Sequence, residues 1–151
     1  MGAFDHLETP LVEAPLFPCE AVPEKPADKK KWSEEYRQSA FVTWMRKNHP
    51  ELITSSVTNE GVRSVFGGVR MKRKGLLPGY PDIIVLWPDG WAFIEFKGFD
   101  ARGQAGKLSP AQIATCNRIH RMGHPVAMFY GAQAAVDWLR SVGAPIRGRV
   151  A

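Results

Sequence analysis

Three charged residues stand in or beside a strongly hydrophobic stretch, PGYPDIIVLWPDGWAFIEFKG, residues 78–98. The runs 81–87 and 91–97 are predicted to be strands, since the Pro-Asp-Gly at 88–90 is typical of a tight turn. Asp82, Glu95 and Lys97 lie at the ends of these strands that are remote from the turn. Burying a charge costs free energy unless a partner or a metal ion compensates it. These three residues are therefore the first candidates for chemistry.

Strand geometry predicts that the three charges converge. Side chains alternate between the two faces of a strand, so Glu95 and Lys97 share a face, and antiparallel pairing brings Asp82 close to Glu95. Two carboxylates suit Mg²⁺, which prefers oxygen ligands, and a neighbouring lysine can position water or stabilise a charged phosphate. The alternative is structural: an ion pair between Glu95 and Lys97, with Asp82 capping a turn.

A helix is predicted from Ser33 to about Asn48. Ser33 is a suitable N-cap, acidic residues follow it, and the helix ends at Asn48-His49-Pro50. Helical spacing places Glu34 on the same stripe as the apolar Phe41. Glu34 is therefore a candidate third carboxylate that points inward.

The remaining segments predict an α/β domain. Residues 52–57 read as a strand and 62–75 as a partly helical segment. Ser109-Pro110 starts a helix that runs to Gly123. A strand at 125–131 and a helix at 132–143 follow. This order predicts a mixed β-sheet flanked by helices on both faces.

Composition separates an acidic N-terminal segment from a basic remainder. The first 28 residues carry six acids and one base, so the rest of the chain has a net charge of +10. Five prolines in the same segment predict an extended arm over residues 1–30, followed by one domain at 31–143 and a tail at 144–151. The basic remainder points toward a polyanionic partner, most often nucleic acid, and the alternative is that the charge serves only solubility. No transmembrane or export segment is evident, and two cysteines without metal spacing fit the cytoplasm.

Basic side chains gather in two places that we expect to contact phosphates. For the cluster at 63–74 the alternative is a solvated helix face. The candidates are Arg63, Arg70, Lys72, Arg73 and Lys74 in the first segment, and Arg102 and Lys107 in the loop at 98–107.

Four ordered segments together resemble the virus-type replication-repair nuclease (VRR-NUC) family of the PD-(D/E)xK nucleases. They are Ser33-Glu34-Glu35 through Gln38 to Trp44; Asn59-Glu60-Gly61 with Arg63; Lys74-Gly75 through Pro78-Gly79-Tyr80-Pro81-Asp82 to Glu95-Phe96-Lys97; and Leu108-Ser109-Pro110 with Gln112. The resemblance covers about residues 33–140 and implies a restriction-endonuclease-like PD-(D/E)xK core.

The resemblance also implies roles for individual residues. Asp82 and Glu95 are expected to ligate Mg²⁺, or Mn²⁺ in its place, together with the backbone carbonyl of Phe96. Lys97 is the expected catalytic lysine. Gln112 is expected to reach into the site from the following helix. Glu34 resembles the additional acidic ligand that the family's first helix supplies. Tyr80 departs from the family pattern, where a small aliphatic residue is common, and we expect it to narrow the mouth of the site.

The expected function is that of a metal-dependent endonuclease hydrolysing DNA phosphodiester bonds. Stand-alone members of the family resemble Holliday-junction resolvases, which implies branched DNA, a role in DNA repair and a homodimer. The stand-alone size suggests a phage or bacterial origin, and so the cytoplasm of a bacterial or phage-infected cell. Two alternatives stay open: a restriction-like, nicking or exonucleolytic enzyme on ordinary duplex DNA, and a non-catalytic DNA-binding module.

Two other motifs are rejected, and the tryptophans are assigned mostly to the core. A phosphate-binding loop ending at Gly106-Lys107 would need glycine at Ala101 and Ser or Thr at Leu108, so this motif is rejected. Gly123 separates His120 from His124, which argues against a zinc site. We expect a core position for most of the tryptophans, namely Trp44, Trp87, Trp91 and Trp138, and expect Trp32 to be free to contact a partner.

Overall fold

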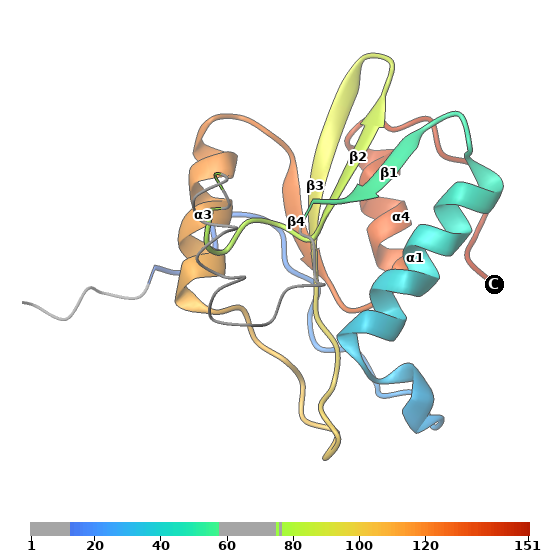
Figure 1. The fold of residues 1–151 in the computed structure, drawn as a ribbon, viewed down its shortest axis with the longest axis vertical. Coiled ribbons are helices and arrows are strands. Elements are labelled where there is room, and N and C mark those ends of the chain that lie inside the picture. The colour runs from blue at the N-terminus through green and yellow to red at the C-terminus, as the bar shows by residue number, and fades with distance from the viewer. Residues whose placement is uncertain (1–12, 58–74, 76) are drawn as a thin grey trace, which may run out of the picture.

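The computed structural model describes residues 13–57, 75 and 77–151, and Figure 1 shows its arrangement. The described elements are, in chain order, η1 (Lys29–Lys31), α1 (Glu34–Asn48), β1 (Ile53–Ser56), β2 (Ile83–Trp87), β3 (Gly90–Phe96), α3 (Pro110–Arg121), β4 (Val126–Phe129) and α4 (Ala132–Ser141). The predicted segment 62–75 lies outside the described residues except for Gly75. The predicted helices and strands over the described residues are confirmed.

The four strands form one mixed sheet in the order β1-β2-β3-β4. The first two pairings are antiparallel, and β3 and β4 run parallel. Helices α1 and α4 cover one face and α3 covers the other (Figure 1). The predicted α/β architecture, consistent with a PD-(D/E)xK core, is therefore confirmed.

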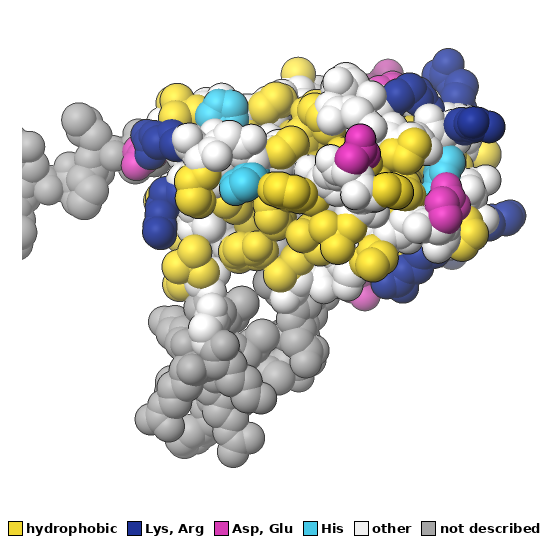
Figure 2. Space-filling model, turned by 90° about the horizontal axis from the view of Figure 1, so that it is seen from above, with side chains coloured by type: hydrophobic (Ala, Val, Ile, Leu, Met, Phe, Trp, Pro, Cys, Tyr) yellow, Lys and Arg dark blue, Asp and Glu magenta, His cyan; other side chains and the backbone are white. Residues whose placement is uncertain are grey.

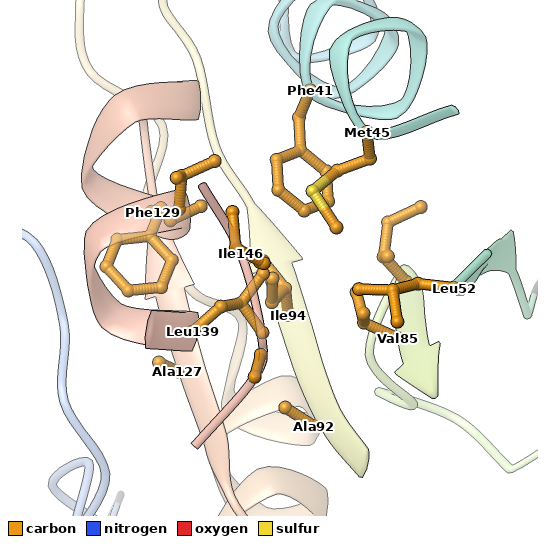
Figure 3. Close-up of a cluster of buried hydrophobic side chains, with 14 of the residues drawn as sticks. Phe41, Met45, Leu52, Val85, Ala92, Ile94, Ala127, Phe129, Leu139 and Ile146 are labelled. Carbon is orange, nitrogen blue, oxygen red and sulfur yellow. The ribbon is translucent and has the colours of Figure 1, made fainter. Parts of the chain in front are cut away.

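The larger core cluster lies between the sheet and the helices α1 and α4. Phe41 and Met45 of α1 point toward Val85 of β2 and Ile94 of β3, as Figure 3 shows, and Leu139 enters from α4. These positions alternate along β2 and β3 with the residues that face α3, as strand geometry requires. Replacing a fully buried Phe by Ala typically costs about 3–5 kcal/mol, so Phe41 contributes strongly to the seating of α1 against the sheet.

A smaller core cluster lies between the sheet and α3. It joins Phe93 of β3 to Cys116 and Ile119 of α3, and it includes Phe17 from the N-terminal segment. The N-terminal segment also pairs with the outer edge of β4: Met128 N–H donates to the Pro18 carbonyl at 3.0 Å. The described part of the predicted arm thus covers an edge strand that would otherwise expose unpaired backbone groups.

The ends of the helices show how distant residues complete the fold. Ser33 caps α1 by accepting from Tyr36 N–H, as the sequence indicates. The start of α4 has no side-chain cap of its own. Instead, Glu20 Oε1 accepts from Tyr130 N–H at 2.9 Å and from Gly131 N–H at 3.0 Å. A carboxylate at a helix N-terminus also interacts favourably with the helix dipole.

The predicted division into arm, domain and tail stays a prediction, although contacts cross both boundaries. Phe17 belongs to the arm and Ala144 and Ile146 to the tail, yet all three are buried in the core clusters.

Of the four tryptophans assigned to the core, three contact the larger cluster. Trp87 is buried, and Trp44 and Trp138 are half-buried against the same cluster. The prediction is wrong for Trp91, which is 42% exposed. Trp91 lies next to the β2–β3 turn on the face of α3. Its ring is 5.2 Å from that of His124, which follows the C-terminal end of α3, so the helix does not cover it.

Figure 2 views the molecule from the end that carries the β2–β3 turn, where hydrophobic side chains are prominent among the described residues. Within the described residues, no helix is long and apolar enough to cross a membrane.

Candidate active site

The two strand carboxylates lie together where β2 begins and β3 ends. Ile83 pairs with Ile94, so the next pair outward is Asp82 and Glu95. Asp82 N–H donates to Glu95 Oε2 at 3.2 Å, and Phe96 N–H donates to Asp82 Oδ2 at 3.0 Å. These reciprocal bonds hold both carboxylates on the face of the sheet that α3 covers. The predicted convergence of Asp82 and Glu95 is confirmed.

Glu34 reaches the same place from the first turn of α1. Its carboxylate, that of Asp82 and that of Glu95 each offer an oxygen atom, and the three atoms lie within 4.8 Å of one another. Lys97 Nζ lies between two of these groups, 3.7 Å from Glu34 Oε2 and 3.8 Å from Glu95 Oε1. Three carboxylates and one ammonium group therefore form a single cluster.

A close backbone approach at Gly98 brings α1 to the end of β3. A Cβ atom at position 98 would lie 2.5 Å from both the Glu34 backbone nitrogen and the Trp32 carbonyl oxygen. Real Cβ atoms do not approach that closely, so this contact requires glycine. Phe99 N–H donates to the same Trp32 carbonyl at 2.7 Å. Gly98 thus positions Glu34 beside Lys97, a role that the sequence analysis missed.

Gln112 is held by the start of α3 and contacts Glu95. Its Oε1 accepts from Ser109 N–H, while Ser109 Oγ accepts from Gln112 N–H, which makes a complete capping box. Its Nε2 then donates to Glu95 Oε1 at 2.7 Å. The Ser-x-x-Gln spacing predicts a capping box, and this signal could have explained in advance why Gln112 is fixed in orientation.

The loop before Asp82 is fixed against the start of α3. Thr115 Oγ1 donates to the Pro78 carbonyl at 2.7 Å, and a Cβ at Gly79, where φ is +78°, would lie 2.1 Å from the Ala111 carbonyl oxygen. Tyr80 packs edge-on against Phe93, with ring centres 5.9 Å apart. Tyr80 is thus half-buried between the sheet and α3. Its expected effect of narrowing the mouth of the site stays a prediction.

Burial and crowding make this a site that favours a positive charge. The Glu95 side chain is fully buried, and burial together with the neighbouring Asp82 carboxylate raises its pKa to about 9, against the lowering effect of Lys97. Burial chiefly, with Glu95 and Asp82 nearby, raises the pKa of the Cys116 thiol to about 12. A carboxylate with so high a pKa holds a proton at neutral pH unless a cation replaces it.

The donor set fits a divalent cation. Carboxylate oxygens are hard ligands, which Mg²⁺ and Mn²⁺ accept, and the described residues place three carboxylates in one cluster. Asp82, Glu95 and Glu34 could hold such an ion. The Phe96 N–H donates to Asp82, and the predicted ligand role of the Phe96 carbonyl stays a prediction.

The predicted phosphate-binding residues are only partly described. Arg102 and Lys107 are exposed on the segment 98–107. This segment folds back on itself: Asp100 N–H donates to the Gln104 carbonyl, and Gly106 N–H donates to the Gly98 carbonyl. The other five predicted residues, Arg63, Arg70, Lys72, Arg73 and Lys74, lie outside the described residues.

A mixed sheet with two carboxylates and a lysine at the end of a β-hairpin is consistent with the core of a PD-(D/E)xK nuclease. The VRR-NUC domain model matches residues 22–133, which is more than half of the chain. The protein therefore belongs to the VRR-NUC family and carries a DNA nuclease domain, as its sequence motifs predict. A search of curated proteins and one of solved structures each returned no match.

Proposed function

We propose that this protein is a Mg²⁺-dependent endonuclease that hydrolyses DNA phosphodiester bonds at the Glu34–Asp82–Glu95 cluster. The supporting observation is the convergence of three carboxylates on Lys97, with ligand oxygens within 4.8 Å of one another. An ion pair alone would need one carboxylate for one lysine. Three carboxylates and one lysine leave excess negative charge, which a divalent cation neutralises.

In this proposal Asp82 and Glu95 are the principal metal ligands, joined by Glu34 and the carbonyl of Phe96. When bound there, Mg²⁺ would polarise the phosphodiester and lower the pKa of a bound water molecule. Mn²⁺ is the expected substitute because it accepts the same oxygen ligands. The Asp82 and Glu95 carboxylates are held in place by backbone N–H donors, so little reorganisation is needed on binding.

Lys97 and Gln112 act on the groups around the ion. Lys97 Nζ, within 4 Å of both Glu34 and Glu95, would hold the attacking water molecule or offset the charge that develops on the phosphate. Gln112 donates to Glu95 Oε1 and fixes the rotamer of this carboxylate. Gln112 is thus a positioning residue in this proposal, with its own orientation fixed by the capping box.

The test is conversion of supercoiled plasmid to nicked and linear forms with Mg²⁺. The wild type is expected to cleave, and Asp82→Ala and Lys97→Ala are each expected to lose at least about a hundredfold in rate. Asp89→Ala and Lys47→Ala are the matched controls, because both residues are exposed and lie away from the cluster. The proposal fails if the wild type cleaves no DNA substrate with Mg²⁺ or Mn²⁺, or if the Asp82 variant retains full activity.

For the substrate, we propose branched DNA of the Holliday-junction type, acted on by a homodimer with two active sites during DNA repair. This step rests on the family resemblance, which also suggests action in the cytoplasm of a bacterial or phage-infected cell. A comparison of four-way junctions, flaps and linear duplexes tests it, and equilibrium sedimentation tests the dimer. Equal cleavage of linear duplex would favour a restriction-like, nicking or exonucleolytic enzyme, and DNA binding without any cleavage would favour a non-catalytic module.

A further inference from the structure

Lysine and arginine side chains gather at the end of the molecule opposite the β2–β3 turn. We define the basic lobe as residues 25–32, which include η1, together with the segment 98–107; both lie at this end in Figure 1. Its six cationic side chains are all exposed: Lys25, Lys29, Lys30, Lys31, Arg102 and Lys107. The lobe also contains Asp28 and Asp100, so its net charge is +4.

The two acidic residues of the lobe serve its backbone. Asp28 Oδ1 accepts from Lys30 N–H at 3.0 Å and so caps η1. Asp100 Oδ1 accepts from the N–H groups of Arg102 and Gln104, both at 2.9 Å. Within the described part of the chain, none of the six cations forms an ion pair. Their charges are therefore available to a partner.

Trp32 joins the two halves of the lobe. Lys25 Nζ and Lys29 Nζ lie 5.3 Å and 5.8 Å from the centre of its ring, and its Nε1 donates to the Pro26 carbonyl at 2.8 Å. A Cβ at Gly103 would lie 2.6 Å from Lys25 Nζ and 3.3 Å from the Trp32 ring, so the tip of the segment 98–107 contacts both residues. Trp32 was expected to be free to contact a partner, but lysines and backbone occupy its surroundings.

The lobe is attached directly to the carboxylate cluster. Trp32 precedes the cap of α1, and its carbonyl accepts from Phe99 N–H. Gly98 follows Lys97, and its backbone approaches that of Glu34. Near the end of the segment 98–107, the Gly106 carbonyl accepts from the Tyr130 hydroxyl at 2.7 Å. The backbone that carries the cations is therefore held next to the candidate active site.

We propose that the basic lobe binds the phosphate backbone of duplex DNA beside the scissile bond. Five of the six cations are lysines, which contact phosphates as point charges, whereas bidentate reading of a base edge favours arginine. Single-strand binding uses exposed aromatic rings as stacking platforms, but in the lobe Phe99 is buried and Trp32 is occupied by lysines. This surface therefore fits a duplex backbone without base readout. The inference rests on the proposed DNA-cleaving function and names the surface that receives the substrate.

The test measures binding without cleavage, using a fluorescent 30-base-pair duplex in EDTA at several salt concentrations. The lobe variant is the triple substitution Lys29→Ala, Lys30→Ala and Lys31→Ala. The matched control removes the same charge elsewhere, with Lys47→Ala, Arg147→Ala and Arg149→Ala. Lys47 lies in the last turn of α1, about 20 Å along the helix from Glu34, and the Arg147 backbone contacts His49 just after that helix. Arg149 follows two residues later and is exposed.

The lobe variant is expected to bind the duplex at least about tenfold more weakly than the control at 100 mM salt. The slope of log affinity against log salt concentration is expected to fall by about 2–3, one contact for each lysine. A triple Lys→Arg variant at 29, 30 and 31 should retain binding, which separates the loss of charge from damage to η1.

Equal duplex affinity of the lobe and control variants would overturn the proposal, as would a loss of affinity confined to a single-stranded oligonucleotide of the same sequence. Because no metal is present, this result is independent of catalysis. If the wild type binds the duplex but cleaves nothing, and the lobe variant loses that binding, the nuclease proposal is refuted while the DNA-binding lobe is supported.

Discussion

The substitution Glu95→Gln separates the cation site from an ordinary ion pair. The pKa of Glu95 is raised from 4.5 to about 9, chiefly by burial and then by Asp82. A carboxyl group with a raised pKa in the folded state favours folding through its protonated form. Its contribution is complete below the unfolded pKa and is lost as the pH rises from about 4.5 toward 9. An amide does not titrate, so Glu95→Gln does not lose this stability as the pH rises.

The size of the effect follows from the pKa difference. At pH 7.5 about three pH units of the shift have been crossed, and each is worth about 1.4 kcal/mol, which sets a ceiling of about 4 kcal/mol. The two Glu95 oxygens accept from Asp82 N–H and from Gln112 Nε2, and an amide keeps only one acceptor oxygen, so the net gain falls below this ceiling. We expect a net gain of about 2 kcal/mol, or roughly 4–8 °C in melting temperature, for a chain of this size.

The assay is thermal unfolding by circular dichroism in EDTA, from pH 5 to pH 8. The melting temperature of Glu95→Gln should equal that of the wild type at pH 5 and should exceed it by a growing margin toward pH 8. Added Mg²⁺ should raise the melting temperature of the wild type and leave that of the variant unchanged. Glu35→Gln, at an exposed position on the same helix as Glu34, is the control and should follow the wild type throughout. Parallel pH profiles of wild type and Glu95→Gln would refute the reasoning.

Two further predictions concern the residues that position the site. Gly98→Ala forces a Cβ to within 2.5 Å of two backbone atoms. This variant should lose about 1–3 kcal/mol of unfolding free energy and should cleave plasmid DNA much more slowly than the wild type. The control is Gly131→Ala, where the nearest neighbour of the added Cβ is 3.8 Å away, and it should change neither stability nor cleavage. Gln112→Ala should weaken Mg²⁺ binding about 10–100-fold, as measured by calorimetry, because it removes the donor to Glu95. Ser109→Ala should lose about 1 kcal/mol of stability with the helix cap but keep most of the metal affinity. Equal metal affinity of the two variants would show that the contact between Gln112 and Glu95 is unimportant.

Much of the site is predictable from the sequence because its geometry is local. Strand alternation and the Pro-Asp-Gly turn are enough to bring Asp82 to Glu95, and a single helical stripe orients Glu34 inward. Gln112 was assigned through the family resemblance, and its Ser-x-x-Gln context carries the physical reason for its orientation. In each case the information spans fewer than about 20 residues of the chain.

The features that escaped prediction depend on contacts between distant segments. Glu20 caps α4 from 110 residues away along the chain, and Phe17 completes the core cluster beneath α3. Neither position carries a periodic pattern that reveals its partner. The exposure of Trp91 depends on where α3 ends in space, and the two halves of the basic lobe meet where Gly103 contacts Trp32. From composition, Lys25 and Lys29 belong to the acidic arm. Net charge does not show which side chains become neighbours, so the basic lobe could not be found in this way.

The central claim is that the Glu34–Asp82–Glu95 cluster binds the cation that DNA cleavage requires. The most direct measurement is the initial rate of plasmid cleavage as Mg²⁺ is titrated into EDTA-treated protein, for the wild type, Asp82→Asn and Asp89→Asn. The account predicts saturable activation of the wild type and of Asp89→Asn, and no cleavage by Asp82→Asn at any Mg²⁺ concentration. Cleavage by the wild type in EDTA, or an Asp82→Asn titration that overlays that of the wild type, would contradict it.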